Sequence, residues 1–106
     1  MKDKNIPSVK RLLLFLLLIL ASCALKPPVQ EMSDARSAIK MAQALPGQQS
    51  PGQQSKADAY LKSAETALDE AAAAIDNEHY DRARTKALEA KRNAQQAARI
   101  KQRKHQ

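Results

Sequence analysis

The sequence is poor in the residues that build disulfide frameworks, large cores and nucleotide-binding loops. Its 106 residues include one cysteine, no tryptophan, two glycines and only 3% aromatic residues. A single cysteine excludes an intramolecular disulfide. Without a glycine-rich loop, the usual phosphate cradle of nucleotide-binding enzymes is also excluded. The length allows one small domain at most.

The residues of a catalytic or metal centre are equally scarce. The two histidines, His79 and His105, have no second histidine or cysteine three or four residues away, the spacing of a metal site on a helix. Asp76, Glu78 and Asp81 flank His79 and allow only weak, adventitious metal binding. Because an enzyme needs several groups that converge in a pocket, we predict a non-enzymatic protein without a cofactor, a metal or catalytic residues.

The first 22 residues have the order of a secretory signal peptide. Positive charges come first, at Lys2, Lys4, Lys10 and Arg11. An uncharged apolar run over 12–21 and small residues follow them, as in exported precursors. The run is half the ~20 residues that cross a bilayer as a helix, and two prolines follow it. An uncleaved membrane anchor is therefore the less favoured alternative.

The only cysteine stands where this segment ends, in the order Leu20-Ala21-Ser22-Cys23. An aliphatic residue, two small residues and a cysteine resemble the lipobox of bacterial lipoprotein precursors. The resemblance implies cleavage after Ser22 and lipidation of the Cys23 thiol, and Ala24 in the next position implies the outer membrane. Each buried methylene of the acyl chains would add ~0.8 kcal/mol to anchoring. A chance cysteine beside an ordinary cleavage site is the alternative.

Cleavage at this point changes the charge and leaves a short tether before the first helix. Four positive charges and one negative charge leave with residues 1–22, so the formal net charge falls from +7 to +4. Residues 23–28 form the lipidated cysteine and a stiff proline spacer. Residues 29–45 then read as a helix, because apolar residues recur every three or four positions. Ser33 and Asp34 are candidates to cap a slightly later start, and Pro46 ends the helix.

Residues 46–55, PGQQSPGQQS, repeat a five-residue unit and hold both glycines, which predicts a flexible linker. From there to residue 104 two heptad-like seams predict an antiparallel helical hairpin with its turn near Asn77. The predicted seam positions are Ala57, Leu61, Ala64, Leu68, Ala71, Ile75, Tyr80, Ala83, Ala87, Ala90, Ala94 and Ala97. The hairpin resembles one tetratricopeptide unit, and the fold class is all-α.

An alanine seam makes a thin core, because a methyl contributes roughly 0.8 kcal/mol where leucine gives ~2. The hairpin alone should be marginal, and two remedies are open: packing of helix 29–45 on the hairpin, or association of copies. Of these we predict self-association or binding of another envelope protein. Tyr60 and Tyr80 either fill gaps in the seam or act as exposed partner anchors. An acidic helix over 56–76 beside a basic one over 79–104 favours the pairing of the two, weakly.

The end of the second hairpin helix is strongly basic. No acid follows Glu89, and six cations do: Lys91, Arg92, Arg99, Lys101, Arg103 and Lys104. Positive charge complements the helix dipole at a C-terminus, which is one explanation. The other is contact with anionic lipid, lipopolysaccharide or a cell-wall polymer. Nucleic acid is not an expected partner of an exported protein.

Two segments carry a family resemblance. VQEMSDARSAIKMAQA, followed by the hairpin with Tyr80-Asp81-Arg82-Ala83 after its turn, resembles bacterial lipoproteins of the domain of unknown function 4398. The family has no assigned biochemistry. The resemblance implies a lipid-anchored envelope protein, and we expect a structural or adaptor module in the periplasm. The alternative function is an electrostatic binder that uses the basic helix end.

Overall fold

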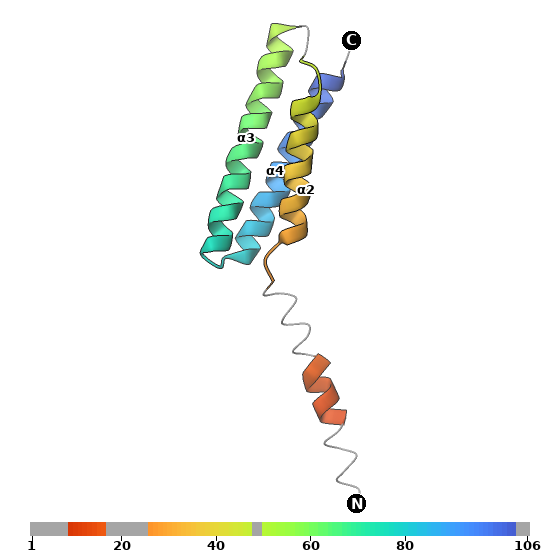
Figure 1. Cartoon of the computed structure of the whole chain (residues 1–106), viewed down its shortest axis with the longest axis vertical. Coiled ribbons are helices and arrows are strands. Elements are labelled where there is room, and N and C mark those ends of the chain that lie inside the picture. Colours follow the sequence, from red (N-terminus) through yellow and green to blue (C-terminus); the bar gives the residue numbers. More distant parts are fainter. Residues whose placement is uncertain (1–8, 17–25, 48–49, 104–106) are drawn as a thin grey trace, which may run out of the picture.

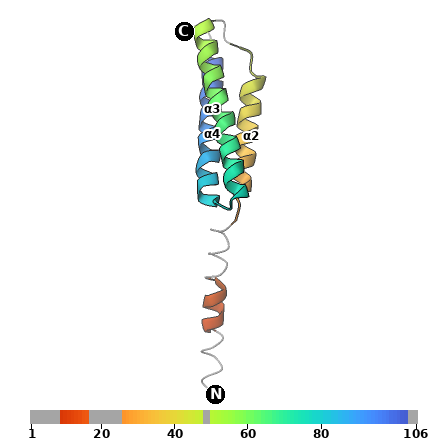
Figure 2. The ribbon, with the colours of Figure 1, turned by 90° about the vertical axis from the view of Figure 1, so that its left-hand side faces the viewer.

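The computed structural model describes residues 9–16, 26–47 and 50–103. Three long helices form a bundle: α2 (Val29–Ala44), α3 (Pro51–Asp76) and α4 (Tyr80–Gln102). Helices α2 and α4 run in the same direction and α3 runs against them (Figure 1). Figure 2 shows α3 and α4 side by side with α2 along their length. The predicted all-α hairpin with a preceding helix is confirmed.

A further short helix covers residues 9–16, within the predicted signal peptide. Its large apolar side chains are exposed, with Leu12 at 69% and Phe15 at 64%. Within the described parts of the chain, no helix is both long enough and apolar enough to cross a membrane.

The bundle core is a stack of layers to which each helix contributes small apolar side chains. The middle layer consists of Ala35, Ala67 and Ala90, one residue from each helix. The layer nearer the α3–α4 turn holds Met32, Ala71 and Ala87. At the opposite end the core is larger and comprises Ile39, Ala42, Leu61, Ala64, Ala94 and Ala97. Methyl groups at most of these positions let the helix backbones approach closely, and Met32, Ile39 and Leu61 are the larger side chains of the layers.

Helix α2 adds the bulk that the hairpin lacks. It packs mainly against α4 and less extensively against α3. Met32 and Ile39, which are 3% and 6% exposed, belong to layers in which α4 contributes only alanine and α3 contributes alanine and Leu61. Of the remedies considered for the thin hairpin core, packing of α2 is therefore the one that the structure contains.

The start of α2 differs from the cap predicted at Ser33 or Asp34, and the predicted end near residue 45 is correct. The helix begins at Val29 because Pro28 precedes it with φ −79°, and the Pro28 carbonyl accepts a hydrogen bond from the Met32 amide at 3.0 Å. Pro28 is fully buried, whereas Val29 is 71% exposed. The first position of the predicted apolar pattern therefore lies outside the core.

The predicted linker over 46–55 is wrong in its second half. Helix α3 already begins at Pro51, so the second PGQQS unit is helical and Ser50 is the N-cap residue. Proline is favourable at the first helical position because its missing N–H has no helical partner there and its φ is preset. The Ser50 carbonyl accepts the Gln54 amide at 3.0 Å. Of the first unit, the described residues Pro46, Gly47 and Ser50 lie outside the helices, whereas the second unit forms the start of α3.

The predicted seams are correct in α4 from Ala83 to Ala97 and shifted in part of α3. Leu68 and Ile75 are only half-buried, and Ala67 and Ala74 take the buried positions. A seven-residue pattern drifts by about 20° per heptad around a straight helix, and the third helix widens the contact surface. Leu68 still packs against all three layers. Tyr80 is half-buried at the start of α4.

In the turn between α3 and α4 the residue with a left-handed backbone is Glu78, whereas the sequence suggested Asn77. Glu78 has φ 61°, and Asn77 instead caps the end of α3 through its side-chain Nδ2, which donates to the Ala73 carbonyl at 3.1 Å. The His79 amide donates to the Ala74 carbonyl at 2.8 Å. A left-handed non-glycine residue costs about 1–3 kcal/mol, which these closing hydrogen bonds offset.

We predict that the middle layer does not tolerate a larger side chain. Ala90→Leu adds three heavy atoms to a layer of three alanines, so the free energy of unfolding should fall by about 1–3 kcal/mol. Urea unfolding measures the change. Ala59→Leu, at an exposed position of α3, is the matched control and should change stability by no more than about 0.5 kcal/mol. A more stable Ala90→Leu variant would show that the layer contains a void.

Candidate functional site

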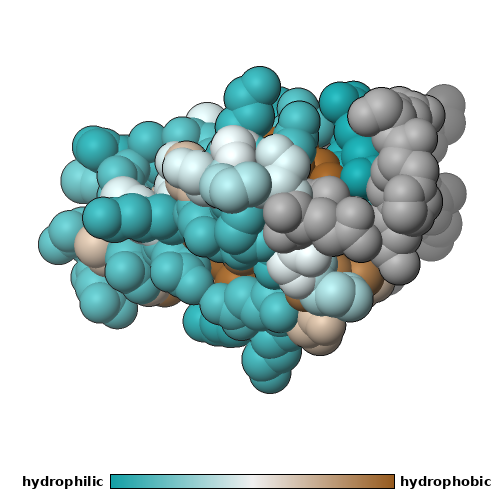
Figure 3. Space-filling model, turned by 90° about the horizontal axis from the view of Figure 1, so that it is seen from above, coloured by the Kyte–Doolittle hydropathy of each residue, from teal (hydrophilic) through white to brown (hydrophobic). Residues whose placement is uncertain are grey.

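The bundle has two chemically different ends. At the turn end, where α2 begins and α3 passes into α4, the exposed residues Asp76, Glu78 and Asp81 are acidic. At the basic end, where α2 and α4 finish and α3 begins, Lys56, Arg99 and Arg103 are exposed. Figure 3 views the molecule from the basic end, and hydrophilic residues dominate the face shown. Cys23, Leu20, Ala21 and Ser22, the predicted lipidation and cleavage residues, lie outside the described residues.

Lys101 is not available to an anionic partner. It is 7% exposed, and its ammonium donates to the Ala42 carbonyl at 2.9 Å and to the Leu45 carbonyl at 3.3 Å. Those carbonyls belong to the end of α2, where the last helical carbonyls have no amide partner. Lys101 therefore closes the C-terminus of α2 from α4, and its predicted role as a surface contact is wrong.

The other predicted cations differ in their freedom. Lys91 is half-buried and lies 4.0 Å from Asp34 Oδ2 of α2. Arg92 is exposed, and Arg99 is exposed with one guanidinium nitrogen 3.3 Å from Gln96 Oε1 on its own helix. Arg103 is exposed just after α4 ends. Lys104 lies outside the described residues.

A groove of about 160 Å³ joins the start of α3 to the end of α4 at the basic end. Its lining includes the cations Lys56, Arg99 and Arg103, together with Gln53, Gln96 and Tyr60. No carboxylate lines it, and none of the three cations has an ion pair within the described residues. The groove therefore presents donors to an anion without a competing acidic group from its own walls.

Tyr60 fills a gap at the core, which is one of its two predicted roles, and the role as a partner anchor stays a prediction. Its side chain is half-buried and packs against the core layer that contains Leu61 and Ala97, and it also lines the groove. Tyr80 is half-buried at the opposite end of the bundle. The two tyrosines thus do not share a surface, and only Tyr60 lies beside the basic residues.

Lys56 and Gln53 line the groove but were not predicted from the sequence as site residues. They lie on α3, and the predicted basic contact was confined to the end of α4. The signal was available in the antiparallel arrangement, because the first turns of one helix of a hairpin lie beside the last turns of the other. This signal was not used because the predicted linker over 46–55 placed Gln53 in a flexible segment.

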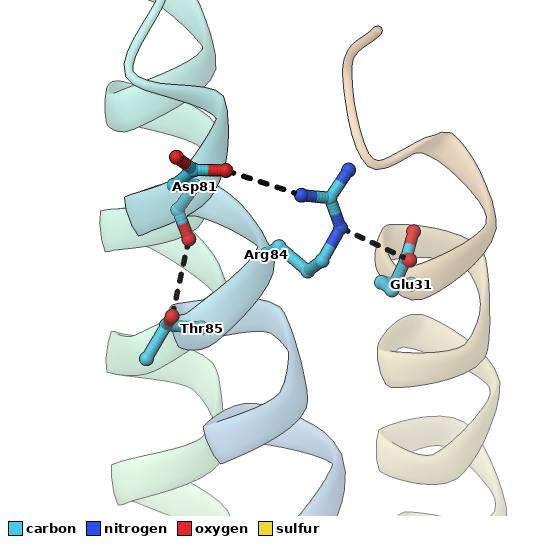
Figure 4. Close-up of polar contacts among 4 residues, drawn as sticks. All are labelled: Glu31, Asp81, Arg84 and Thr85. Atoms are coloured by element: carbon cyan, nitrogen blue, oxygen red, sulfur yellow. Dashed lines mark hydrogen bonds and ion pairs between the residues drawn. The ribbon is translucent and has the colours of Figure 1, made fainter. Parts of the chain in front are cut away.

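Ion pairs hold α4 to both other helices, not only to the acidic α3. Arg84 joins α4 to α2, with its Nε 3.3 Å from Glu31 Oε1, and its Nη1 lies 3.4 Å from Asp81 (Figure 4). The Thr85 hydroxyl donates to the Asp81 carbonyl at 3.1 Å. These contacts occupy cations near the turn end, in contrast to the groove.

Lys86 joins α4 to α3 and shifts the titration of its partner. Its Nζ lies 2.8 Å from Glu70 Oε2 and 3.2 Å from Glu89 Oε2. The hydrogen bond from Lys86 lowers the pKa of Glu70 below its ordinary value of 4.5. The hydrogen bonds to Glu70 and then Glu89 raise the pKa of Lys86 above its ordinary 10.5.

Among the described residues, no group of three or more histidine, cysteine or acidic side chains is placed to hold a metal ion. His79 therefore lies at the turn without a set of ligands around it within that part of the chain.

No protein-family model, no curated protein and no solved structure matches this chain. The resemblance to lipoproteins of the domain of unknown function 4398 thus stays a prediction, and function is argued from the bundle and its residues.

We predict that Lys101 stabilises the bundle. Lys101→Met keeps the length of the side chain but leaves the Ala42 and Leu45 carbonyls without their donor, which should lower the free energy of unfolding by about 1–3 kcal/mol. Urea unfolding is the measurement, and Lys40→Met at an exposed position of α2 is the control. Equal stability of the two variants would contradict the capping role.

The Glu70–Lys86 pair should make stability depend on pH. Because the pKa of Glu70 is lowered in the folded state, its contribution is present above about pH 4.5 and is lost as the pH falls through the lowered value. Glu70→Gln should therefore destabilise the protein near neutral pH and lose this effect in strong acid. Because the pKa of Lys86 is raised in the folded state, the stabilising contribution of its charge is present at neutral pH and is lost only as the pH rises through the raised value.

Urea unfolding at about pH 7 and about pH 2.5 tests this dependence. Asp69→Asn is the control, because Asp69 is exposed and has no ion pair within the described residues. A loss of stability that is the same for Glu70→Gln at both pH values would show that the ion pair is not its cause.

Proposed function

We propose that the protein is a lipid-anchored, non-enzymatic structural or adaptor module of the bacterial cell envelope, with its bundle in the periplasm. The lipobox-like order Leu20-Ala21-Ser22-Cys23 after an apolar run supports anchoring and export. Ala24 supports the outer membrane over the inner membrane. The proposal assigns no catalytic residue and no cofactor.

The single observation that carries the proposal is how few residues of the sequence lie between Cys23 and the first residue of α2. Five residues separate Cys23 from Val29, the first residue of α2, and Pro28 is buried against the bundle at that point. The six residue steps from Cys23 to Val29 span at most about 22 Å when fully extended. An acyl group on Cys23 would therefore hold the turn end close to the membrane and direct the basic end away from it.

A short anchor and a rigid bundle suit an adaptor. The 16 residues of α2 rise about 24 Å, so the basic end would stand at least that far along the helix axis from the anchored end. The helices of the bundle are held together by packed layers, by the Lys101 cap and by ion pairs, which keep the two ends of the bundle at a fixed separation. Such a module presents a partner site at a defined distance from the membrane surface.

Metabolic labelling with a clickable fatty acid in the producing cell tests the anchor. The wild-type chain should carry the label and lose residues 1–22, whereas Cys23→Ser should be unlabelled and keep Met1 in intact-mass spectrometry. Lys26→Ser, three residues into the tether, is the control and should be labelled like the wild type. A free Cys23 thiol in the native protein would overturn the proposal.

A further inference from the structure

The groove at the basic end carries a cation that the fold does not need. Arg99 and Arg103 lie at the C-terminal end of α4, where positive charge complements the helix dipole and thus stabilises the helix. Lys56 is the sixth residue of α3, far from the C-terminus of that helix, so the helix dipole gives its positive charge no stabilisation. Lys56 also has no ion pair within the described residues. Helix stability therefore explains the two arginines but not the lysine.

The three cations converge although they come from two helices. Lys56 reaches the groove from α3, and Arg99 and Arg103 reach it from α4. Like charges that face one groove repel one another, and an anion in the groove would remove that repulsion. Arginine offers several N–H donors in a planar fork, and Gln53 and Gln96 add amide groups that can bind the polar groups around a charge.

We infer that this groove binds an anionic group of a cell-wall polymer. The small volume, about 160 Å³, suits a single carboxylate or phosphate with its neighbouring polar groups. Tyr60 supplies a half-buried aromatic wall on which a sugar or peptide backbone can lie. Repeated anionic groups along a polymer would raise the effective concentration at the site.

The choice of a polymer over the anchoring membrane rests on the proposed function. If Cys23 is lipidated, the groove lies at the opposite end of the bundle from the anchor, separated by the length of α2. The lipid head groups of the anchoring membrane would then lie at the turn end of the bundle, away from the groove. The wall polymer is the anionic partner that stands away from the membrane.

Cosedimentation of the full chain, purified in a non-ionic detergent, with isolated cell-wall sacculi tests this inference. The wild type should bind at low salt and lose affinity as salt screens the charges. Lys56→Gln removes one charge-assisted contact and should weaken binding about fivefold. The combined variant Lys56→Gln, Arg99→Gln and Arg103→Gln should weaken binding about a hundredfold.

Lys62→Gln is the matched control. Lys62 is a second exposed lysine on α3, but the groove that it lines also contains Glu70 and Glu89. The affinity of the Lys62→Gln variant for sacculi should stay within about twofold of that of the wild type. Far-UV circular dichroism and thermal melting check folding, and Lys56→Gln should not lower the melting temperature because Lys56 does not stabilise its helix.

Three outcomes would overturn the inference. The first is no binding of the wild type at low salt. The second is an equal loss in Lys56→Gln and Lys62→Gln, which would mean a diffuse effect of net charge. The third is displacement from sacculi by mixed micelles that contain an anionic phospholipid, which would assign the groove to lipid head groups. Fatty-acid labelling of Cys23 is measured separately, so loss of the anchor and failure of the groove are told apart.

Discussion

The close approach of helices across alanine is the constraint on which the rest of the structure depends. Ala83, Ala87 and Ala90 of α4 are fully buried, and each contributes only a methyl to the core. Two helices joined in this way bury too little apolar area to be stable alone, since each methyl contributes roughly 0.8 kcal/mol. The third helix therefore becomes necessary, and its Met32 and Ile39 add larger side chains to two of the core layers.

The need for α2 explains why so much of α4 is devoted to holding it. Arg84 pairs with Glu31 near the start of α2, Lys91 lies near Asp34, and Lys101 closes the end of α2. A buried ammonium costs free energy unless its donors are satisfied, and two carbonyls satisfy Lys101 here. Several cations of α4 thus have a structural role, and in its last turns Arg99 and Arg103 lie together without an ion pair within the described residues.

The helices themselves were predictable because their signals are local. Spacing of apolar residues at three and four positions located all three long helices, and the burial of Ala83 through Ala97 agreed with the predicted seam. Most of what failed depends on tertiary context. The left-handed Glu78 and the shift from Leu68 to Ala67 follow from how α3 meets its neighbours. The helical second PGQQS unit has a local cause instead, because its proline occupies the first helical position. Part of the site was predictable from the sequence, because the run of positive charge identified Arg99 and Arg103. Lys56 was not predictable in this way, because its place in the site depends on α3 beginning beside the end of α4.

Lys101 shows why a run of charge is an incomplete guide to a binding surface. Six cations follow Glu89 in the sequence, yet a helix turns each successive residue by 100° and so distributes such a run around its axis. One direction faces α2 and takes Lys101 into the bundle, another faces α3 and brings Arg99 and Arg103 to Lys56. The cations that matter for an anionic partner are those that the helix rotation leaves together and without a carboxylate. By that criterion the groove is defined by residues from two helices, and its charge is set by the arrangement of the bundle more than by the composition of α4.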